Sequence, residues 1–210
     1  MRAISQNRFP HAHIISGPDG VGKTTLAIDL ARTINCTGES RPCSECSQCI
    51  RIFNETHTDV KFIGPRDQLM DDDRSHSIIS IDEVRVIQRE SNLKPFEGRY
   101  RVFIFSNINL LSQEASNSLL KILEEPPDQV IFILLAAEIT RLLPTILSRC
   151  HKIELGVVPL TPLAEEIGHR YDFKSEKSMD IARISRGRPE HAIELCENPD
   201  LISDFSEKLN

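Results

Sequence analysis

The stretch Gly17-Pro18-Asp19-Gly20-Val21-Gly22-Lys23-Thr24 has the pattern G-x-x-x-x-G-K-T, which is typical of a phosphate-binding loop. The apolar residues 13–16 before it predict a short strand, and residues 24–32 after it have helical periodicity. A glycine-rich loop between a strand and a helix N-terminus forms an anion site, because backbone N–H groups point inward and the helix dipole favours negative charge. An ordinary glycine-rich turn is the alternative, and it explains the complete pattern and its two flanks less well.

The loop predicts binding of ATP with Mg²⁺. Lys23 would reach the β- and γ-phosphates, and the Thr24 hydroxyl would ligate the metal. We therefore expect the nucleotide contacts to come from one continuous run: Gly17, Pro18, Asp19, Gly20, Val21, Gly22, Lys23, Thr24 and Thr25.

The composition is that of an ordinary soluble protein, with 210 residues of which 40% are hydrophobic and 27% are charged. The formal net charge of −6 argues against a free-standing DNA or RNA binder, which usually has a basic surplus, although a local basic patch stays open. No apolar run approaches membrane length, and the N-terminus lacks the apolar core of a signal peptide. We therefore expect a cytoplasmic protein without membrane contact.

Four cysteines, Cys36, Cys43, Cys46 and Cys49, lie within fourteen residues, with the spacing C-x6-C-x2-C-x2-C. This spacing predicts a tetrahedral structural zinc site, because four thiolates fill its coordination. Cytosolic chains rarely carry disulfides, so a metal explains the cluster better, with an iron–sulfur cluster as the alternative.

The rest of the chain first alternates strands with helices and then becomes entirely helical. We predict strands at 60–63, 101–105, 130–135 and 151–155, with helices at 22–35, from 81 to about 93, from Ser112 to Glu125, and at 142–149, the last interrupted by Pro144. After Pro159 we predict helices near 162–170, 176–186, 189–197 and 200–208. This order predicts an α/β domain with a central parallel sheet (1–157) and a small all-α domain (158–210).

Three local patterns refine this assignment. Ser80 and Glu83 form a predicted capping box, and Thr161 with Pro162 predicts an N-cap followed by proline at the first helical position. The triplet Asp71-Asp72-Asp73 could bind a cation, but a solvated loop is the commoner outcome for such a run.

The strand at 101–105 lacks the acidic end that a phosphate-loop ATPase needs. Such an enzyme uses a carboxylate there to hold Mg²⁺ and another residue to orient the attacking water. Here the strand is followed by Ser106-Asn107, and neither side chain carries a charge. We therefore predict slow or absent hydrolysis. Glu124 and Glu125 are expected to be solvated charges at a helix end.

Several segments point to one family. They occur in order over essentially the whole chain: the run Phe9-Pro10-His11-Ala12 with the loop at 17–24, the four-cysteine module, residues 116–127 and residues 143–150. Together they resemble subunits of the bacterial DNA polymerase III clamp loader, an AAA+ assembly. The resemblance implies an AAA+ P-loop NTPase domain with a zinc module at 36–49, followed by a helical lid domain. It also implies a third, collar domain in full-length members, which we expect to be absent from residues 1–210.

Within that family, three departures favour the non-hydrolysing delta-prime stator over the gamma/tau motor. They are Ser106-Asn107, Ala136-Ala137 where a sensor residue is typically polar, and Glu190 where the motor has its second-sensor arginine. Arg188 is close to that position but two residues away. Lys23 and Thr24 are intact, so ATP binding without turnover is expected, and an active gamma/tau-type motor is the alternative.

The resemblance gives Ser148-Arg149-Cys150 a role across a subunit interface. Arg149 would act in trans as an arginine finger on a neighbour's ATP, and the alternative is a surface arginine that caps a short helix. The implied partners are the gamma/tau and delta subunits in a hetero-oligomer, which meets the sliding clamp and primer-template DNA. A small-molecule kinase is a further alternative, but it leaves the zinc module and the helical tail unexplained.

Overall fold

The computed structural model describes residues 9–64 and 78–198. The chain forms two compact units. The first comprises Met1–Ser16 and Thr24–Glu154, and the second comprises Gly17–Lys23 and Leu155–Asn210. The acidic triplet at 71–73 and the helix predicted at 200–208 lie outside the described residues.

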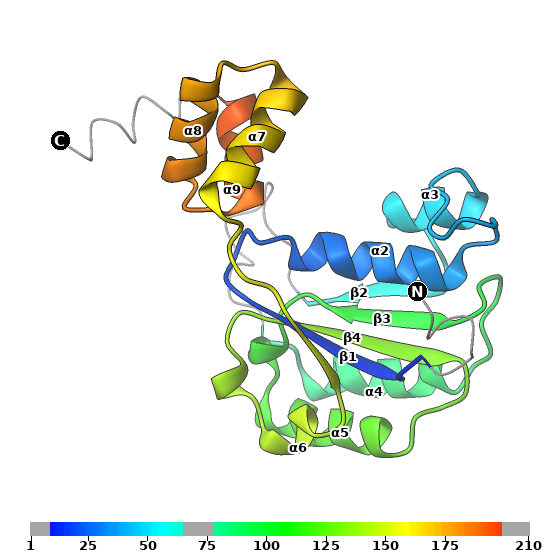
Figure 1. The fold of residues 1–210 in the computed structure, drawn as a ribbon. Helices are drawn as coiled ribbons and strands as arrows, with labels where there is room; N and C mark the ends of the chain where they lie inside the picture. Colours follow the sequence, from blue (N-terminus) through cyan, green and yellow to red (C-terminus); the bar gives the residue numbers. More distant parts are fainter. Residues whose placement is uncertain (1–8, 65–77, 199–210) are drawn as a thin grey trace. The chain divides into compact units, whose positions relative to one another are not determined.

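A five-stranded parallel sheet forms the centre of the first unit (Figure 1), with the strand order β2-β3-β4-β1-β5. Its strands are β1 (Ala12–Ser16), β2 (Val60–Ile63), β3 (Arg101–Phe105), β4 (Val130–Ala136) and β5 (His151–Glu154). Every residue of β1, β3 and β4 is buried, which explains why their sequences are almost continuously apolar. The predicted α/β fold with a central parallel sheet is confirmed.

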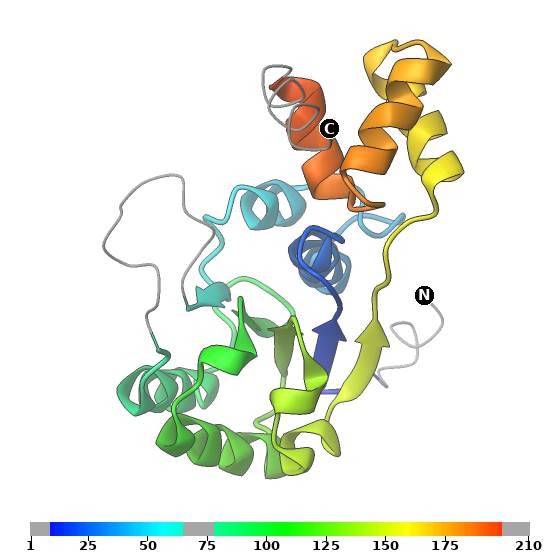
Figure 2. The same cartoon turned by 90° about the vertical axis from the view of Figure 1, so that its left-hand side faces the viewer.

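Helices cover both faces of this sheet. They are α2 (Lys23–Asn35), α3 (Ser47–Phe53), α4 (Ile81–Ser91), α5 (Gln113–Glu124) and α6 (Pro144–Leu147), with 3₁₀ turns η1 (Ile108–Leu110) and η2 (Ile139–Arg141). Helix α2 lies on one face, and α4 and α5 lie together on the other (Figures 1 and 2). Between the sheet and these two helices lies a hydrophobic core, in which Phe103 stacks on Phe132 with ring centroids 5.6 Å apart.

Two predicted helix starts are confirmed. At α4, the Ser80 hydroxyl accepts the Glu83 N–H at 3.3 Å, and the Glu83 carboxylate accepts the Ser80 N–H at 2.7 Å. At α5, the Ser112 hydroxyl accepts the Ala115 N–H at 3.1 Å. Each bond satisfies a backbone donor that the first helical turn leaves without a partner.

The short helix near residue 145 differs from its prediction. Pro144 does not interrupt a helix over 142–149; it begins α6 at the first helical position. Proline is tolerated there because the first N–H groups of a helix have no intrahelical acceptor. Helix α3, in the cysteine module, was not predicted, since its seven residues are too few to show a periodicity.

The second unit contains helices α7 (Leu160–Tyr171), α8 (Ser175–Ile184) and α9 (Pro189–Glu197). They pack around their own core, which includes Leu163, Ile167, Ile181 and Leu195. The predicted N-cap at Thr161 is wrong: Pro159 is the N-cap, and its carbonyl accepts the Leu163 N–H at 3.2 Å. Pro162 falls inside the first turn, where its missing N–H costs nothing.

Candidate functional site

The phosphate-loop pattern leads directly into α2, which begins at Lys23 and has no acidic residue in its first turn. Three glycines of the loop have positive φ angles, Gly17 (149°), Gly20 (77°) and Gly22 (93°). At Gly17 a Cβ atom would lie only 2.2 Å from the Leu155 carbonyl oxygen, so a larger residue does not fit. The loop conformation therefore depends on the glycines that define the pattern.

Lys23 lies against the loop that precedes it. Its Nζ donates to the carbonyls of Gly17 and Pro18, each at 2.8 Å, and to the Asp19 carboxylate at 3.1 Å. An ammonium held among acceptors in this way can exchange them for phosphate oxygens. Thr24 and Thr25 follow in the first turn of α2, and both are exposed.

Helix α9 contacts the same loop within the second unit. The Glu190 N–H donates to the Gly20 carbonyl at 3.1 Å. A Cβ on Gly20 would lie 3.2 Å from a ring carbon of His191 and 3.4 Å from the Cβ of Arg188. The sequence indicated Arg188 and Glu190 here, but it gave no signal for His191, whose place depends on packing.

The end of β3 has uncharged groups that bond to nearby backbone. The Ser106 N–H and hydroxyl both donate to the Ile63 carbonyl, at 2.9 and 3.1 Å. The Asn107 side-chain oxygen accepts the Asn109 N–H at 3.1 Å and thereby begins η1. Neither side chain can hold Mg²⁺ by charge or deprotonate water.

Arg149 follows α6 and pairs with the end of α5. Its Nη2 lies 2.7 Å from Glu124 Oε1, and its Nη1 donates to the Thr145 carbonyl at 2.8 Å. The side chains of Arg149 and Glu124 are 32% and 50% exposed. Glu124 is exposed at the end of α5, as expected of a solvated helix-end charge, and it also forms this ion pair. The sequence could not show the pair, because 25 positions separate its members.

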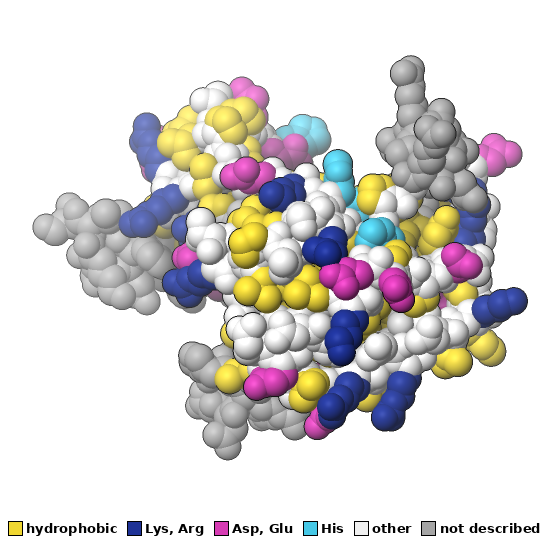
Figure 3. Space-filling view, turned by 90° about the horizontal axis from the view of Figure 1, so that it is seen from below, with side chains coloured by type: hydrophobic (Ala, Val, Ile, Leu, Met, Phe, Trp, Pro, Cys, Tyr) yellow, Lys and Arg dark blue, Asp and Glu magenta, His cyan; other side chains and the backbone are white. Residues whose placement is uncertain are grey.

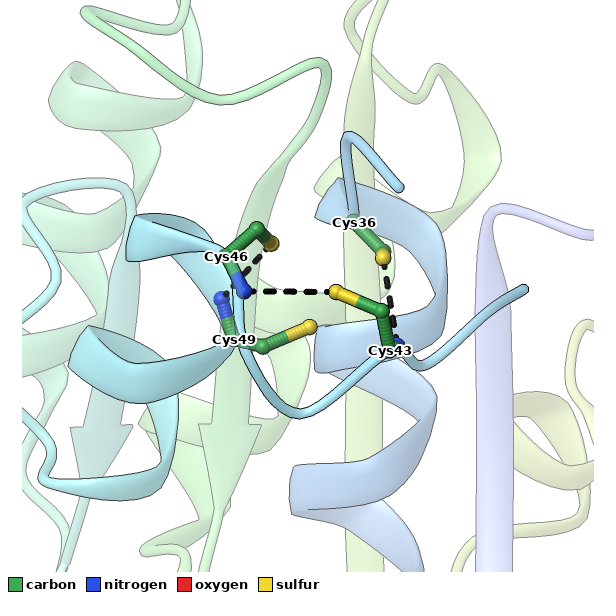
Figure 4. A group of neighbouring side chains, drawn as sticks. All are labelled: Cys36, Cys43, Cys46 and Cys49. Atoms are coloured by element: carbon green, nitrogen blue, oxygen red, sulfur yellow. Dashed lines mark hydrogen bonds between the residues drawn. The ribbon is translucent and has the colours of Figure 1, made fainter. Parts of the chain in front are cut away.

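The four cysteines of the module come together (Figure 4), and their sulfur atoms all lie within 4.8 Å of one another. Cys36 directly follows α2, Cys46 is the N-cap of α3, and Cys49 lies in its first turn. Gly38 makes room for this arrangement, since a Cβ there would lie 2.9 Å from the Cβ of Cys43. The cluster can bind a metal ion.

Backbone donors around the sulfurs suit thiolates. The Cys43 N–H donates to Cys36 Sγ at 3.4 Å, and the Cys46 N–H donates to Cys43 Sγ at 3.3 Å. Burial raises the pKa of Cys49 to about 12. Burial acts in the same direction on Cys46, but donors from Thr37 and Cys49 outweigh it and lower the pKa of Cys46 to about 5.

The surface seen in Figure 3 has basic side chains interspersed with acidic ones. Among residues 9–64 and 78–198, no helix combines the length and the apolar character needed to cross a membrane.

Comparison with known protein families assigns the chain to one family. The family described as "DNA polymerase III, delta subunit" matches residues 1–159. The chain belongs to this family.

The individual relatives are DNA polymerase III subunits of the tau and gamma type. The chain is 38% identical over 154 residues to the DNA polymerase III subunit tau of Bacillus subtilis, covering 72% of this chain and 26% of that protein. It is 29% identical over 208 residues to the tau/gamma subunit of Haemophilus influenzae, covering 96% of this chain and 29% of that protein. The chain therefore spans less than a third of the length of these relatives.

Solved structures show the same fold. A DNA polymerase III gamma subunit-related protein of Thermotoga maritima superposes with a TM-score of 0.65 at 21% identity, covering 93% of this chain and 55% of that one. The RuvB Holliday junction branch migration motor of Thermotoga maritima gives 0.60 at 21%, covering 100% and 65%. The predicted AAA+ P-loop fold is confirmed.

Proposed function

We propose that this chain is the AAA+ part of a delta-prime-like subunit of the DNA polymerase III clamp loader, with a helical lid over residues 158–210. It acts in the cytoplasm as a stator during ATP-dependent loading of the sliding clamp onto primer-template DNA. The observation that carries the proposal is the end of β3, where Ser106 and Asn107 bond to nearby backbone and supply no carboxylate. A site with no acid at this position lacks metal charge compensation and water activation together.

The loop itself retains the means to bind ATP. Lys23 would bind the β- and γ-phosphates, Thr24 would ligate Mg²⁺, and the run from Gly17 to Thr25 would surround the phosphates. Mg²⁺ would supply charge neutralisation between the phosphates. The chain's own residues therefore support binding and positioning of the nucleotide, without turnover.

Arg149 is the residue that we assign to a neighbour's site. Its side chain is 32% exposed, and the residue lies two positions before β5 in the sequence. Placed beside the ATP of an adjacent gamma/tau subunit, it would stabilise charge on the transferring phosphoryl group, an effect worth roughly 10³ to 10⁵ in rate. The complex would also contain a delta subunit, as a hetero-oligomer.

We propose zinc as the metal of the four-cysteine cluster. Zinc prefers four thiolates in a closed tetrahedral site, and such sites are structural. Cys36, Cys43, Cys46 and Cys49 supply those four ligands from one short segment.

The test measures ATP turnover, stimulated by DNA and clamp, in a complex assembled from the full-length protein and its partner subunits. Arg149→Ala is expected to lower turnover by at least about 10³-fold at the neighbouring site. Lys23→Ala is expected to leave turnover unchanged while reducing ATP binding to the isolated protein. Arg141→Ala, which removes an exposed arginine from the preceding 3₁₀ turn, is the matched control.

The alternative is an active gamma/tau-type motor, which the intact loop and the tau and gamma relatives favour. It predicts the opposite pattern. If Lys23→Ala causes the main loss of turnover, this subunit hydrolyses ATP itself, and the stator assignment is wrong.

A further inference from the structure

The loop between α4 and β3, residues 92–100, combines an exposed surface with a firmly bonded backbone. Leu93 and Phe96 are 59% and 81% exposed. The loop that carries these apolar side chains has no strand or helix of its own. Its conformation must therefore come from the groups that bind its backbone.

Three buried side chains bind that backbone, and one of them is Arg101, whose Nη2 donates to the Lys94 carbonyl at 3.2 Å. Asp59, fully buried, accepts the N–H groups of residues 96, 97 and 98, each at 2.8 Å. Asn35 is 1% exposed. Its side-chain oxygen accepts the N–H groups of Arg99 and Tyr100 at 2.9 Å, and its amide donates to the Tyr100 carbonyl at 3.1 Å. Five consecutive amides are thus fixed by two residues.

Both of these residues are connected to the cysteine module. Asn35 is the last residue of α2 and directly precedes Cys36. The Asp59 N–H donates to His57 Nδ1 at 3.0 Å, so His57 Nε2 carries the ring proton and donates to the Gln48 side-chain oxygen. Gln48 directly precedes Cys49 in the sequence.

A second connection runs through charge. Arg51, in α3, lies 2.5 Å from the Glu97 carboxylate and donates to the Thr56 carbonyl at 3.0 Å. Helix α3 therefore presents Gln48 and Arg51 one turn apart, toward His57 and toward the loop.

Helix α3 depends on the cysteines for its own stability. It has seven residues, and helices of that length are not stable in isolation. Its N-cap is the Cys46 sulfur, which accepts the Cys49 N–H at 3.4 Å. A metal ion coordinated by both Cys46 and Cys49 would cross-link the two ends of this first turn. The buried side chains of the helix are those of Cys49 and Ile52, so one of its two buried positions is itself a candidate metal ligand.

We propose that the metal bound by the four cysteines holds the 92–100 loop in place through Asn35, His57 and Arg51. The four-cysteine module then stabilises the conformation of the 92–100 loop, which exposes Leu93 and Phe96. Removal of the metal loosens α3, breaks the contacts of Gln48 and Arg51, and releases the loop. This inference rests on the zinc site proposed above, but not on the proposed role in clamp loading.

Amide hydrogen exchange tests whether the metal stabilises the 92–100 loop. We compare the zinc-loaded chain with the same chain after chelation, and measure the amides of residues 96–98. Loss of the metal is expected to speed their exchange by at least about tenfold, which corresponds to about 1.4 kcal/mol of local stability. The amides of β4 are the internal control and should keep their protection.

Two results would overturn the proposal. One is unchanged exchange at 96–98 in a chain shown by metal analysis to contain no zinc. The other is an equal loss of protection in β4, since the metal would then support the whole unit and not this loop.

A variant that keeps all four cysteines tests the contacts of Gln48 and Arg51 separately from metal binding. Gln48→Ala with Arg51→Ala should speed exchange at 96–98 while zinc content stays at one per chain. Gln113→Ala, at the exposed start of α5, is the control and should change neither quantity. The chain contains no Trp, so Phe96→Trp adds a single reporter whose fluorescence anisotropy should fall on chelation. Normal exchange in the double variant would refute the route through α3.

Discussion

Asp59→Asn is the substitution for which the structure gives the sharpest expectation. The carboxylate is fully buried, and its partners are three backbone N–H groups and the Arg101 guanidinium, whose Nη2 lies 3.2 Å from Oδ1. All of these partners are donors. An asparagine has the same shape, but its NH₂ group would face a donor, and Arg101 would lose its countercharge.

The magnitude follows from the burial of both partners. Removing one member of a buried ion pair costs about 3–5 kcal/mol, because the other charge is left uncompensated. The side chains of Arg101 and Asp59 are only 10% and 0% exposed, so solvent screens the pair little. In a chain of this size each kcal/mol lowers the melting temperature by about 2–4 °C. We therefore expect the melting temperature of Asp59→Asn to lie about 6–20 °C below that of the parent.

The same residue gives a pH dependence with a definite sign. Burial favours the neutral acid, but the N–H donors of the loop and the guanidinium outweigh it and hold the pKa of Asp59 below its ordinary value. The folded state then binds fewer protons than the unfolded state near pH 4, so this stabilisation is present above that pH and is lost as pH falls through the folded pKa. The difference between the parent and Asp59→Asn should therefore shrink in acid.

Urea unfolding at pH 7 and at pH 3.5 measures the loss of free energy of unfolding and its pH dependence, and thermal unfolding at pH 7 measures the fall in melting temperature. Asp82→Asn is the matched control, because Asp82 forms an ion pair with Arg85 at 3.0 Å but is 82% exposed. It should change the free energy of unfolding by less than about 1 kcal/mol. A change at Asp59 as small as that of the control, or one that does not vary with pH, would refute the argument.

Three further predictions concern the loop, the module and a helix start. Gly17→Ala would place a Cβ 2.2 Å from the Leu155 carbonyl oxygen. The substitution should destabilise the loop by at least about 1–3 kcal/mol and weaken ATP binding, which calorimetry measures. The control is Gly156→Ala, where a Cβ meets nothing within 4 Å. Cys43→Ser should reduce bound zinc well below one per chain by metal analysis, whereas Cys150→Ser should not, and equal zinc in both would contradict the assignment. Ser80→Ala removes the cap of α4 and should cost about 1 kcal/mol in chemical unfolding, with Ser175→Ala, at the exposed first residue of α8, as the control that removes no capping bond.

The fold was predictable because its central elements are continuous apolar runs. Residues 101–105 and 130–136 form fully buried strands, and their short length and their β-branched and aromatic residues distinguish such apolar runs from a buried helix. Caps marked by side chains were equally readable, as at Ser80 and Ser112. The start of α7 was not, since its N-cap is Pro159, which makes no side-chain capping bond.

The candidate site was predictable only where its chemistry is local in sequence. The phosphate-loop pattern and the cysteine spacing each occupy one short segment. The partner of Arg149 and the approach of His191 to Gly20 depend on residues far apart in the chain. The bonds of Asp59 to the 92–100 loop cross 37 to 39 positions, and no period or motif marks them.

The edge strand β5 has a consequence for solubility. It pairs with β1 on one side, and its sequence His151-Lys152-Ile153-Glu154 leaves all but Ile153 exposed. An edge strand offers unpaired backbone groups to any other strand that approaches it, and charged side chains discourage such association. Lys152 and Glu154 thus act as gatekeepers against aggregation. A change of both to valine would leave the parallel sheet intact and should make the chain prone to self-association through this edge.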